Sequence, residues 1–190
     1  MPKSRDFEKQ TAQFLQEYKV SGKSALDIGA RYRSKYGAGL FMGLQKLGVK
    51  NYVILEIFDG YVRELQKHGY PVVQGDVRNI QKYFKPGSFD IVAWIHGIEH
   101  LNNLVEIQES IDKLKEITRH WLILSFPIGE EKQGAIANNP YEIHRYFIMD
   151  IEKILSCFGK HDIVHSVVYS RAIRGFYPNA VILYDKGLIK

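Results

Sequence analysis

Acidic residues and a glycine stand near the ends of two apolar runs, where their types and spacing suit the binding of a nucleoside. Asp27 and Gly29 lie in the run Ser24-Ala-Leu-Asp-Ile-Gly-Ala30, and Glu56 closes the run Tyr52-Val-Ile-Leu-Glu56. Strand, glycine turn, helix, strand and acid are the layout of a nucleoside-binding βαβ unit. A glycine lets the backbone approach a ligand closely. A carboxylate at Glu56 can accept hydrogen bonds from both hydroxyls of a ribose.

The same arrangement recurs further along the chain. Gly75-Asp76 follows the apolar run Pro71-Val-Val-Gln74, and Phe89-Asp-Ile-Val-Ala-Trp-Ile95 leads into His96-Gly-Ile-Glu-His-Leu101. Taken in order, these segments closely resemble the four motifs of class I S-adenosylmethionine-dependent methyltransferases, over roughly residues 22–185. The segments that carry the resemblance are Leu26-Asp-Ile-Gly29, Glu56, Gly75-Asp76, and Phe89-Asp-Ile-Val92 followed by Ile98-Glu-His-Leu101.

The resemblance implies S-adenosylmethionine as the cofactor and assigns it a set of residues. By resemblance, Asp27 orients the ligand's ammonium group, Glu56 binds the ribose hydroxyls, and Asp76 accepts from the adenine amino group. For each acid the alternative is an ordinary strand-end polar residue or a helix cap. Trp94 either packs against adenine or belongs to the core. The full expected set is Asp27, Gly29, Ala30, Glu56, Ile57, Asp76, Val77 and Trp94.

The first loop departs from the family pattern. The family usually has Asp-x-Gly-x-Gly after the first strand, but Arg31 stands at the second glycine position and the next glycines are Gly37 and Gly39. Either the loop is extended, with the later glycine turn opening the helix, or cofactor affinity is poor. A β-carbon at Arg31 fits if its φ is negative. A catalytically silent adenosyl-binding or scaffold domain therefore remains an alternative to an enzyme.

A His-x-x-Glu-His cluster, formed by His96, Glu99 and His100, offers metal-ligating groups. This is the zinc signature of inverted metallopeptidases, but it follows a strand and contains Gly97, a poor helix former. It also resembles the Glu-x-x-Glu-His segment with which some methyltransferases, including ubiquinone-pathway O-methyltransferases, hold a divalent cation. His96 replaces their first Glu, which makes an oxygen-rich magnesium site less natural. We expect no metal, with Glu99 and His100 orienting the following helix.

His96 is the preferred catalytic candidate, because the resemblance places the transferred methyl group after the fourth strand. A neutral imidazole there can remove a proton from a substrate hydroxyl, with a pKa near 6.5 if unperturbed. The alternative is an imidazole that only hydrogen-bonds the loop.

Residues 138–147 resemble an Asn-Pro-Tyr-x-x-His stretch of methyltransferases associated with surface polysaccharide synthesis. In this long loop Tyr141 and His144 are the substrate-side candidates, with His144 the second catalytic candidate; the alternative is surface polar residues.

These observations predict an enzyme that transfers a methyl group to oxygen or nitrogen of a small molecule or glycan.

The formal charge of +5 is concentrated in residues 1–50, which hold ten Lys/Arg against four Asp/Glu. Arg31, Arg33 and Lys35 could thus attract an anionic substrate, unless they only form a solvated loop. Nucleic acid is not indicated, because no basic-aromatic stripe or recognition module is present.

Composition is that of an ordinary globular chain, with 45% hydrophobic and 25% charged residues. No apolar run approaches the ~20 residues that cross a bilayer, and the first residues lack a signal-peptide core. The single Cys157 excludes an intramolecular disulfide and fits a reducing compartment. We expect one cytoplasmic domain over residues 1–190, with a helix in 1–20 and a methyltransferase-like core in 22–185. The sequence does not specify an oligomeric state.

The elements that must position these residues alternate between strand and helix. Apolar patterning predicts strands near 24–28, 52–56, 71–74, 89–94 and 120–125, and helices at about 38–47, 59–68, 103–117 and 147–158. An amphipathic N-terminal helix is predicted from the spacing of Phe7, Thr11, Phe14, Leu15 and Tyr18. Residues 162–169 and 180–184 form two strands without a helix between them, and so pair antiparallel. The fold class is therefore α/β, a three-layer Rossmann-like methyltransferase fold with a mostly parallel seven-stranded sheet and an antiparallel C-terminal strand.

Overall fold

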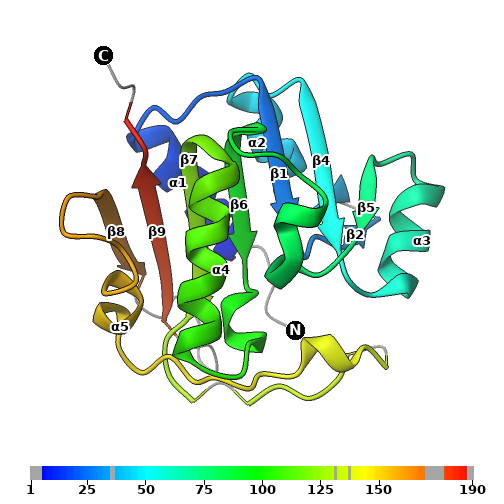
Figure 1. Ribbon diagram of the computed structural model, residues 1–190. Coiled ribbons are helices and arrows are strands. Elements are labelled where there is room, and N and C mark those ends of the chain that lie inside the picture. Colours follow the sequence, from blue (N-terminus) through cyan, green and yellow to red (C-terminus); the bar gives the residue numbers. More distant parts are fainter. Residues whose placement is uncertain (1–5, 35–36, 131, 137, 170–177, 188–190) are drawn as a thin grey trace.

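A seven-stranded sheet forms the centre of the molecule (Figure 1). The computed structural model describes residues 6–34, 37–130, 132–136, 138–169 and 178–187. In spatial order the strands are β5, β4, β1, β6, β7, β9 and β8. Their bounds are β1 Ser24–Ile28, β4 Asn51–Glu56, β5 Val72–Gln74, β6 Phe89–Ile95, β7 Thr118–Pro127, β8 Ile163–Tyr169 and β9 Asn179–Asp185.

The strand directions confirm the predicted mixed sheet. Neighbours from β5 to β7 pair in parallel, whereas β9 pairs antiparallel with both β7 and β8. The predicted pairing of the last two strands is therefore correct, although their connector at 170–177 lies outside the described residues. Because the first five strands run the same way, their carboxyl ends meet at one edge of the sheet.

Helices cover both faces of the sheet and complete three layers. On β6, Val92 and Trp94 pack in the cluster that contains Ile111 of α4. Ile91 and Ala93 face the other way, into the cluster that contains Leu44 of α2. Burial on both faces explains why β6 reads as a continuous apolar run. Figure 1 shows α4 in front of the sheet and α1 and α2 behind it. The helices are α1 Asp6–Glu17, α2 Phe41–Lys46, α3 Asp59–Lys67, α4 Leu104–Ile117 and α5 Ile151–Leu155.

Two helices begin later than the sequence pattern predicts. The α2 helix begins at Phe41, because the preceding residues form a turn with Gly39 at a φ of +43°. The α5 helix begins at Ile151, where the Asp150 side chain accepts a hydrogen bond from the backbone of Glu152 as an N-cap. The residues before α2 that were predicted as helical lie in a short strand, β3 Gly37–Ala38, and the turn after it, and those before α5 lie in a loop.

The N-terminal helix is present and packs on the sheet as its spacing predicts. Thr11, Phe14 and Leu15 are buried, while Tyr18 is 38% exposed. The side chain of Phe7 lies outside the described part of the structure. Among the described residues, no helix is both long enough and apolar enough to span a membrane.

The short elements that the sequence did not predict lie around the carboxyl edge of the sheet. A two-stranded hairpin occupies the first loop, and three short 3-10 helices follow later strands. Their bounds are β2 Tyr32–Arg33, β3 Gly37–Ala38, η1 Val77–Lys82, η2 Ile98–His100 and η3 Pro140–Glu142.

Candidate active site

A pocket of about 300 Å³ opens where the carboxyl ends of β1, β4, β5 and β6 meet. Most of the residues singled out from the sequence line it. Those present are Gly29, Glu56, Ile57, Asp76, Val77, Trp94, His96 and Tyr141. Asp27, Ala30 and His144 are not among the described residues of its lining. The sheet thus gathers at one place residues from the ends of four strands, as ligand sites in open α/β sheets do, and Tyr141 joins them from η3.

Glu56, the last residue of β4, presents a buried carboxyl group to the pocket. It is 4% exposed, and its Oε1 atom accepts a hydrogen bond of 2.7 Å from the backbone of Phe58. Burial raises the pKa of Glu56 to about 7, although the bond from Phe58 acts in the opposite direction. A partly desolvated carboxylate gains from further hydrogen-bond donors. The two hydroxyls of a ribose are donors of that kind.

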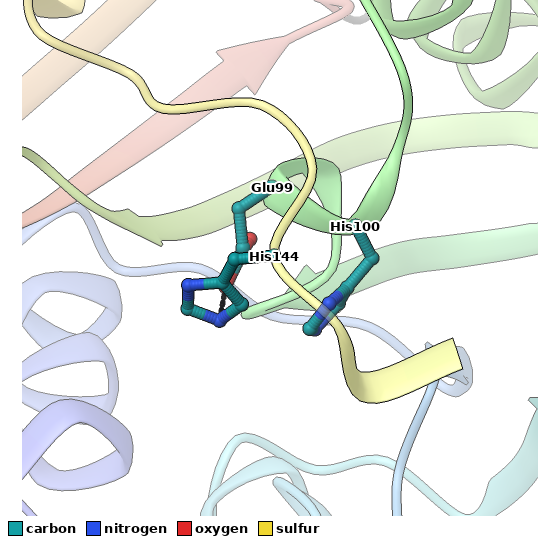
Figure 2. Close-up of side chains that lie close together, drawn as sticks. All are labelled: Glu99, His100 and His144. Carbon is teal, nitrogen blue, oxygen red and sulfur yellow. Dashed lines mark ion pairs between the residues drawn. The ribbon is translucent and has the colours of Figure 1, made fainter. Parts of the chain in front are cut away.

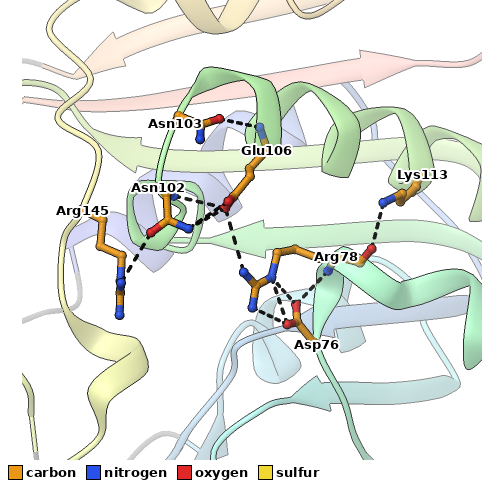
Figure 3. Close-up of polar contacts among 7 residues, drawn as sticks. All are labelled: Asp76, Arg78, Asn102, Asn103, Glu106, Lys113 and Arg145. Carbon is orange, nitrogen blue, oxygen red and sulfur yellow. Dashed lines mark hydrogen bonds and ion pairs between the residues drawn. The ribbon is translucent and has the colours of Figure 1, made fainter.

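Asp76 immediately precedes η1 as its N-cap residue, in contact with an arginine that the sequence analysis missed. Its carboxylate accepts from the backbone of Arg78 at 2.9 Å and from the Arg78 guanidinium at 2.6 Å (Figure 3). Partial burial acts to raise the pKa of Asp76, but the bonds from Arg78 lower it overall. The same guanidinium lies 4.0 Å from Glu106 of α4. Asp76 is therefore ionised and also caps a helix, as the alternative interpretation foresaw.

Asp27 holds the first loop in place from beneath. It is 2% exposed, and its Oδ2 atom accepts from the backbone of Leu40 at 2.8 Å and from the hydroxyl of Tyr52 at 2.6 Å. A β-carbon at Gly39 would come within 2.3 Å of the same oxygen, which explains the glycine there. These contacts support a positioning role for Asp27 in place of direct contact with a ligand in the pocket.

The loop that carries Arg31 is extended. This was one of the two consequences considered for the arginine at the second glycine position of the family pattern. Gly29 makes the turn with a φ of +73°, whereas Arg31 is not among the described non-glycine residues with positive φ. The β-carbon of Arg31 is therefore unstrained. Its guanidinium lies 3.5 Å from the hydroxyl of Tyr61 and 4.0 Å from Glu142. Arg31 thus links the first loop to two residues of the pocket lining.

His96 occupies a strained position at the end of β6. Its φ is +52°, and its backbone nitrogen donates to the carbonyl of Ser125 at 2.7 Å. A quarter of the side chain is exposed, while the ring Nε2 atom is buried. Burial lowers the pKa of His96 to about 4, well below the unperturbed value expected from the sequence. The imidazole is thus neutral at neutral pH, and backbone strain of this kind is common at functional sites.

Trp94 combines the two roles between which the sequence left a choice. It is 3% exposed and belongs to the core cluster beneath α4, and it also lines the pocket. A β-carbon at Gly97 would lie 1.8 Å from the indole Nε1 atom. The backbone after His96 therefore lies directly against this side chain, which fixes one wall of the pocket.

Solved structures of S-adenosylmethionine-dependent methyltransferases match this chain over nearly its whole length. One from Archaeoglobus fulgidus is 15% identical, with 96% of this chain and 97% of that chain covered and a TM-score of 0.63. The methyltransferase domain of a bacterial Hen1 is 17% identical over 95% and 98%, with a TM-score of 0.66. The N-methyltransferase NodS from Bradyrhizobium japonicum is 9% identical over 96% and 97%, with a TM-score of 0.64. The chain has the class I methyltransferase fold. No family model matches the sequence, and no curated protein matches it significantly.

Several residues of this methyltransferase fold line the pocket without having been singled out from the sequence. Glu142, Asn139 and Arg145 lie in the stretch that was compared with polysaccharide-associated methyltransferases, so that motif was a usable signal. No sequence signal identified Tyr61 on α3 or Asn102 before α4, because only the packing of their segments turns these side chains toward the pocket. The residues missed are Tyr61, Arg78, Asn102, Asn139, Glu142 and Arg145.

Tyr141 and His144, the two substrate-side candidates, end up in different places. Tyr141 lines the pocket and is 46% exposed, so it can contact a ligand. The side chain of His144 is only 4% exposed, and its Nε2 atom lies 4.0 Å from Oε1 of Glu99. His144 therefore lies behind the pocket wall, where a direct catalytic contact with substrate is not supported.

Replacing Asp27 with alanine should destabilise the fold. The change leaves the buried amide of Leu40 and hydroxyl of Tyr52 without this acceptor. We expect the free energy of unfolding, measured by chemical denaturation, to fall by about 2–4 kcal/mol. Tyr52→Phe is the matched control, since it removes one of the two bonds and should cost about 1–2 kcal/mol. Equal stability of Asp27→Ala and wild type would contradict the positioning role.

Proposed function

We propose that the protein binds S-adenosylmethionine in this pocket and transfers its methyl group to oxygen or nitrogen of a small molecule or glycan. The observation that carries the proposal is the buried Glu56 carboxyl group at the end of β4. It lies in one pocket with Asp76 and Gly29, which come from the neighbouring strand ends. This placement, in a chain with the class I methyltransferase fold, fits an adenosyl group.

The lining residues divide the work of binding between them. Glu56 would accept hydrogen bonds from the ribose hydroxyls, and Asp76 with the backbone of Val77 would contact adenine. Gly29, with open space where a side chain would stand, leaves room for a ligand close to the backbone. The cofactor supplies a methyl group on a sulfonium, which is already a good leaving group. The chain then has two tasks, which are to align the acceptor and to take up its proton.

His96 is the proposed proton acceptor, because it is neutral and lines the pocket after β6. Its low pKa makes it a weaker base than a free imidazole, but a neutral one throughout the physiological range. Tyr141, an exposed residue of η3 in the pocket lining, is the proposed contact for the acceptor. Glycan acceptors are proposed from the sequence resemblance of residues 138–147, and an N-methyltransferase is among the structural neighbours.

Titration with S-adenosylhomocysteine by calorimetry tests the cofactor assignment. We expect saturable binding with one ligand per chain, together with a rise in melting temperature. Absence of both heat and thermal shift at millimolar ligand would overturn the proposal. Because the reaction product is used, the test needs no knowledge of the methyl acceptor.

A catalytically silent adenosyl-binding or scaffold domain is the second candidate. The observation in its favour is that the Asp76 carboxylate already pairs with Arg78, so one expected cofactor contact is engaged within the protein. Binding of S-adenosylhomocysteine without methylation of any acceptor, in a panel of sugars and amines, would support it. Turnover with one acceptor would exclude it.

The basic first loop should make acceptor binding depend on salt if the substrate is anionic. Arg31 stands at the pocket, and the charge of Arg33 acts on His96. Lys35 lies outside the described residues. The double variant Arg31→Ala/Arg33→Ala should raise KM several-fold at low salt and less at high salt, because screening weakens the attraction in wild type. Lys46→Ala/Lys50→Ala, two exposed charges outside this loop, is the control. A KM ratio independent of salt would indicate a merely solvated loop.

A further inference from the structure

The loop after η3 is attached to the 3-10 helix η2 through the backbone of one residue. The carbonyl of Glu99 accepts hydrogen bonds from the backbone of Arg145 at 2.9 Å and of Tyr146 at 3.1 Å. The backbone of His144 in turn donates to the carbonyl of Gln133 at 3.2 Å. These bonds hold His144 against η2, although it is far from η2 in the sequence.

Three side chains with metal-ligating atoms meet at this junction. One nitrogen of His100, one of His144 and one oxygen of Glu99 all lie within 4.8 Å of one another. Figure 2 shows the Glu99 carboxylate beside the imidazole of His144, with the ring of His100 next to them. Metal–ligand bonds of about 2.1 Å place ligand atoms roughly 3–4 Å apart. The 4.0 Å between Nε2 of His144 and Oε1 of Glu99 already falls within this range.

Two of the three side chains are buried, and the ring of His100 is oriented by the backbone. Glu99 is 1% exposed, and the side chain of His144 is 4% exposed. The carbonyl of Ile143 lies 3.2 Å from Nδ1 of His100. When that nitrogen donates to the carbonyl, Nε2 keeps its lone pair for a ligand, as is usual for metal-bound histidines.

We propose that Glu99, His100 and His144 form a binding site for one divalent transition-metal ion. Two imidazoles and one carboxylate favour zinc or manganese over magnesium, which prefers oxygen ligands. The sequence alone predicted no metal, because His96 replaces the first Glu of the family motif and the motif follows a strand; the fold brings His144 to Glu99 and His100. His100 also lines the pocket, so the ion lies at its wall. If the proposed methyl transfer is correct, an ion held by these three residues would supply a Lewis acid at the pocket wall formed by His100.

The test is titration of chelator-treated, full-length protein with ZnCl2, MnCl2 and MgCl2 by calorimetry. We expect one zinc or manganese ion per chain, with affinity at least 100-fold above that for magnesium, and a higher melting temperature with the bound ion. Glu99→Gln and His144→Gln should each weaken binding at least tenfold. His161→Gln, which removes an exposed histidine outside the cluster, should leave it unchanged.

Two results would overturn the metal site. One is the absence of stoichiometric binding to wild type, and the other is wild-type affinity in both cluster variants. Two separate substitutions are used, so that loss of folding in one, detected by circular dichroism, still leaves the other to decide. The titration needs neither cofactor nor acceptor. Failure of the metal site is therefore distinguishable from failure of the proposed methyl transfer, which the binding of S-adenosylhomocysteine tests.

Discussion

Replacing His96 with asparagine should lower turnover by about 10²-fold or more and leave the affinity for S-adenosylmethionine within a few-fold. The imidazole is neutral and lines the pocket beyond β6, so its loss removes the proposed proton acceptor. Asparagine suits the comparison because it tolerates the positive φ of this position. The measurement is kcat with an identified acceptor, together with the dissociation constant of the cofactor by calorimetry.

His96→Gly is the companion variant, because glycine removes both the imidazole and the backbone strain. It should be as inactive as the asparagine variant, although its backbone is unstrained. Equal losses of turnover and cofactor affinity would mean that His96 supports the adenosyl pocket. Survival of turnover in both variants would assign proton removal to another group or show that the acceptor needs no base.

Glu56→Gln should weaken S-adenosylmethionine binding by about 1.5–3 kcal/mol, the scale of hydrogen bonds to a charged group.

The same change should stabilise the protein without ligand. Burial raises the pKa of Glu56 from 4.5 to about 7, so wild type is progressively destabilised as the pH rises through this interval. Above pH 7 the variant should gain about 3 kcal/mol in free energy of unfolding, and the gain should vanish as the pH falls toward 4.5.

The affinity for the cofactor should follow the ionisation of Glu56. Ribose hydroxyls donate to a carboxylate, so binding favours the ionised form and strengthens as the pH rises through about 7. Wild type should bind S-adenosylhomocysteine about tenfold more weakly at pH 6 than at pH 8. The glutamine variant, which cannot ionise, should show no such step. Unchanged affinity in Glu56→Gln would show that this residue does not hold the ribose.

Apolar patterning predicted the central strands of the sheet well, because β1 and β6 and the second half of β7 are buried on both faces. It failed at the starts of α2 and α5. The delayed start of α2 depends on the bond from Leu40 to Asp27, and residues close in space but separate in the sequence leave no periodic signal. The role expected for Asp27 changes for the same reason, since its partners lie on the following loop and on β4.

The sequence by itself determined which residue types stand at the ends of parallel strands. In such a sheet those ends share one edge. Given the strand order of this fold, Gly29, Glu56, Asp76 and His96 therefore lie close together. Only the tertiary structure decided which of them face the pocket and with what charge. Burial sets the pKa values of Glu56 and His96, and the neighbouring Arg78 sets that of Asp76. The contact of His144 with Glu99 likewise depends on backbone hydrogen bonds that attach its loop to η2. Every residue type carries these backbone groups, so no sequence pattern reveals which of them will pair.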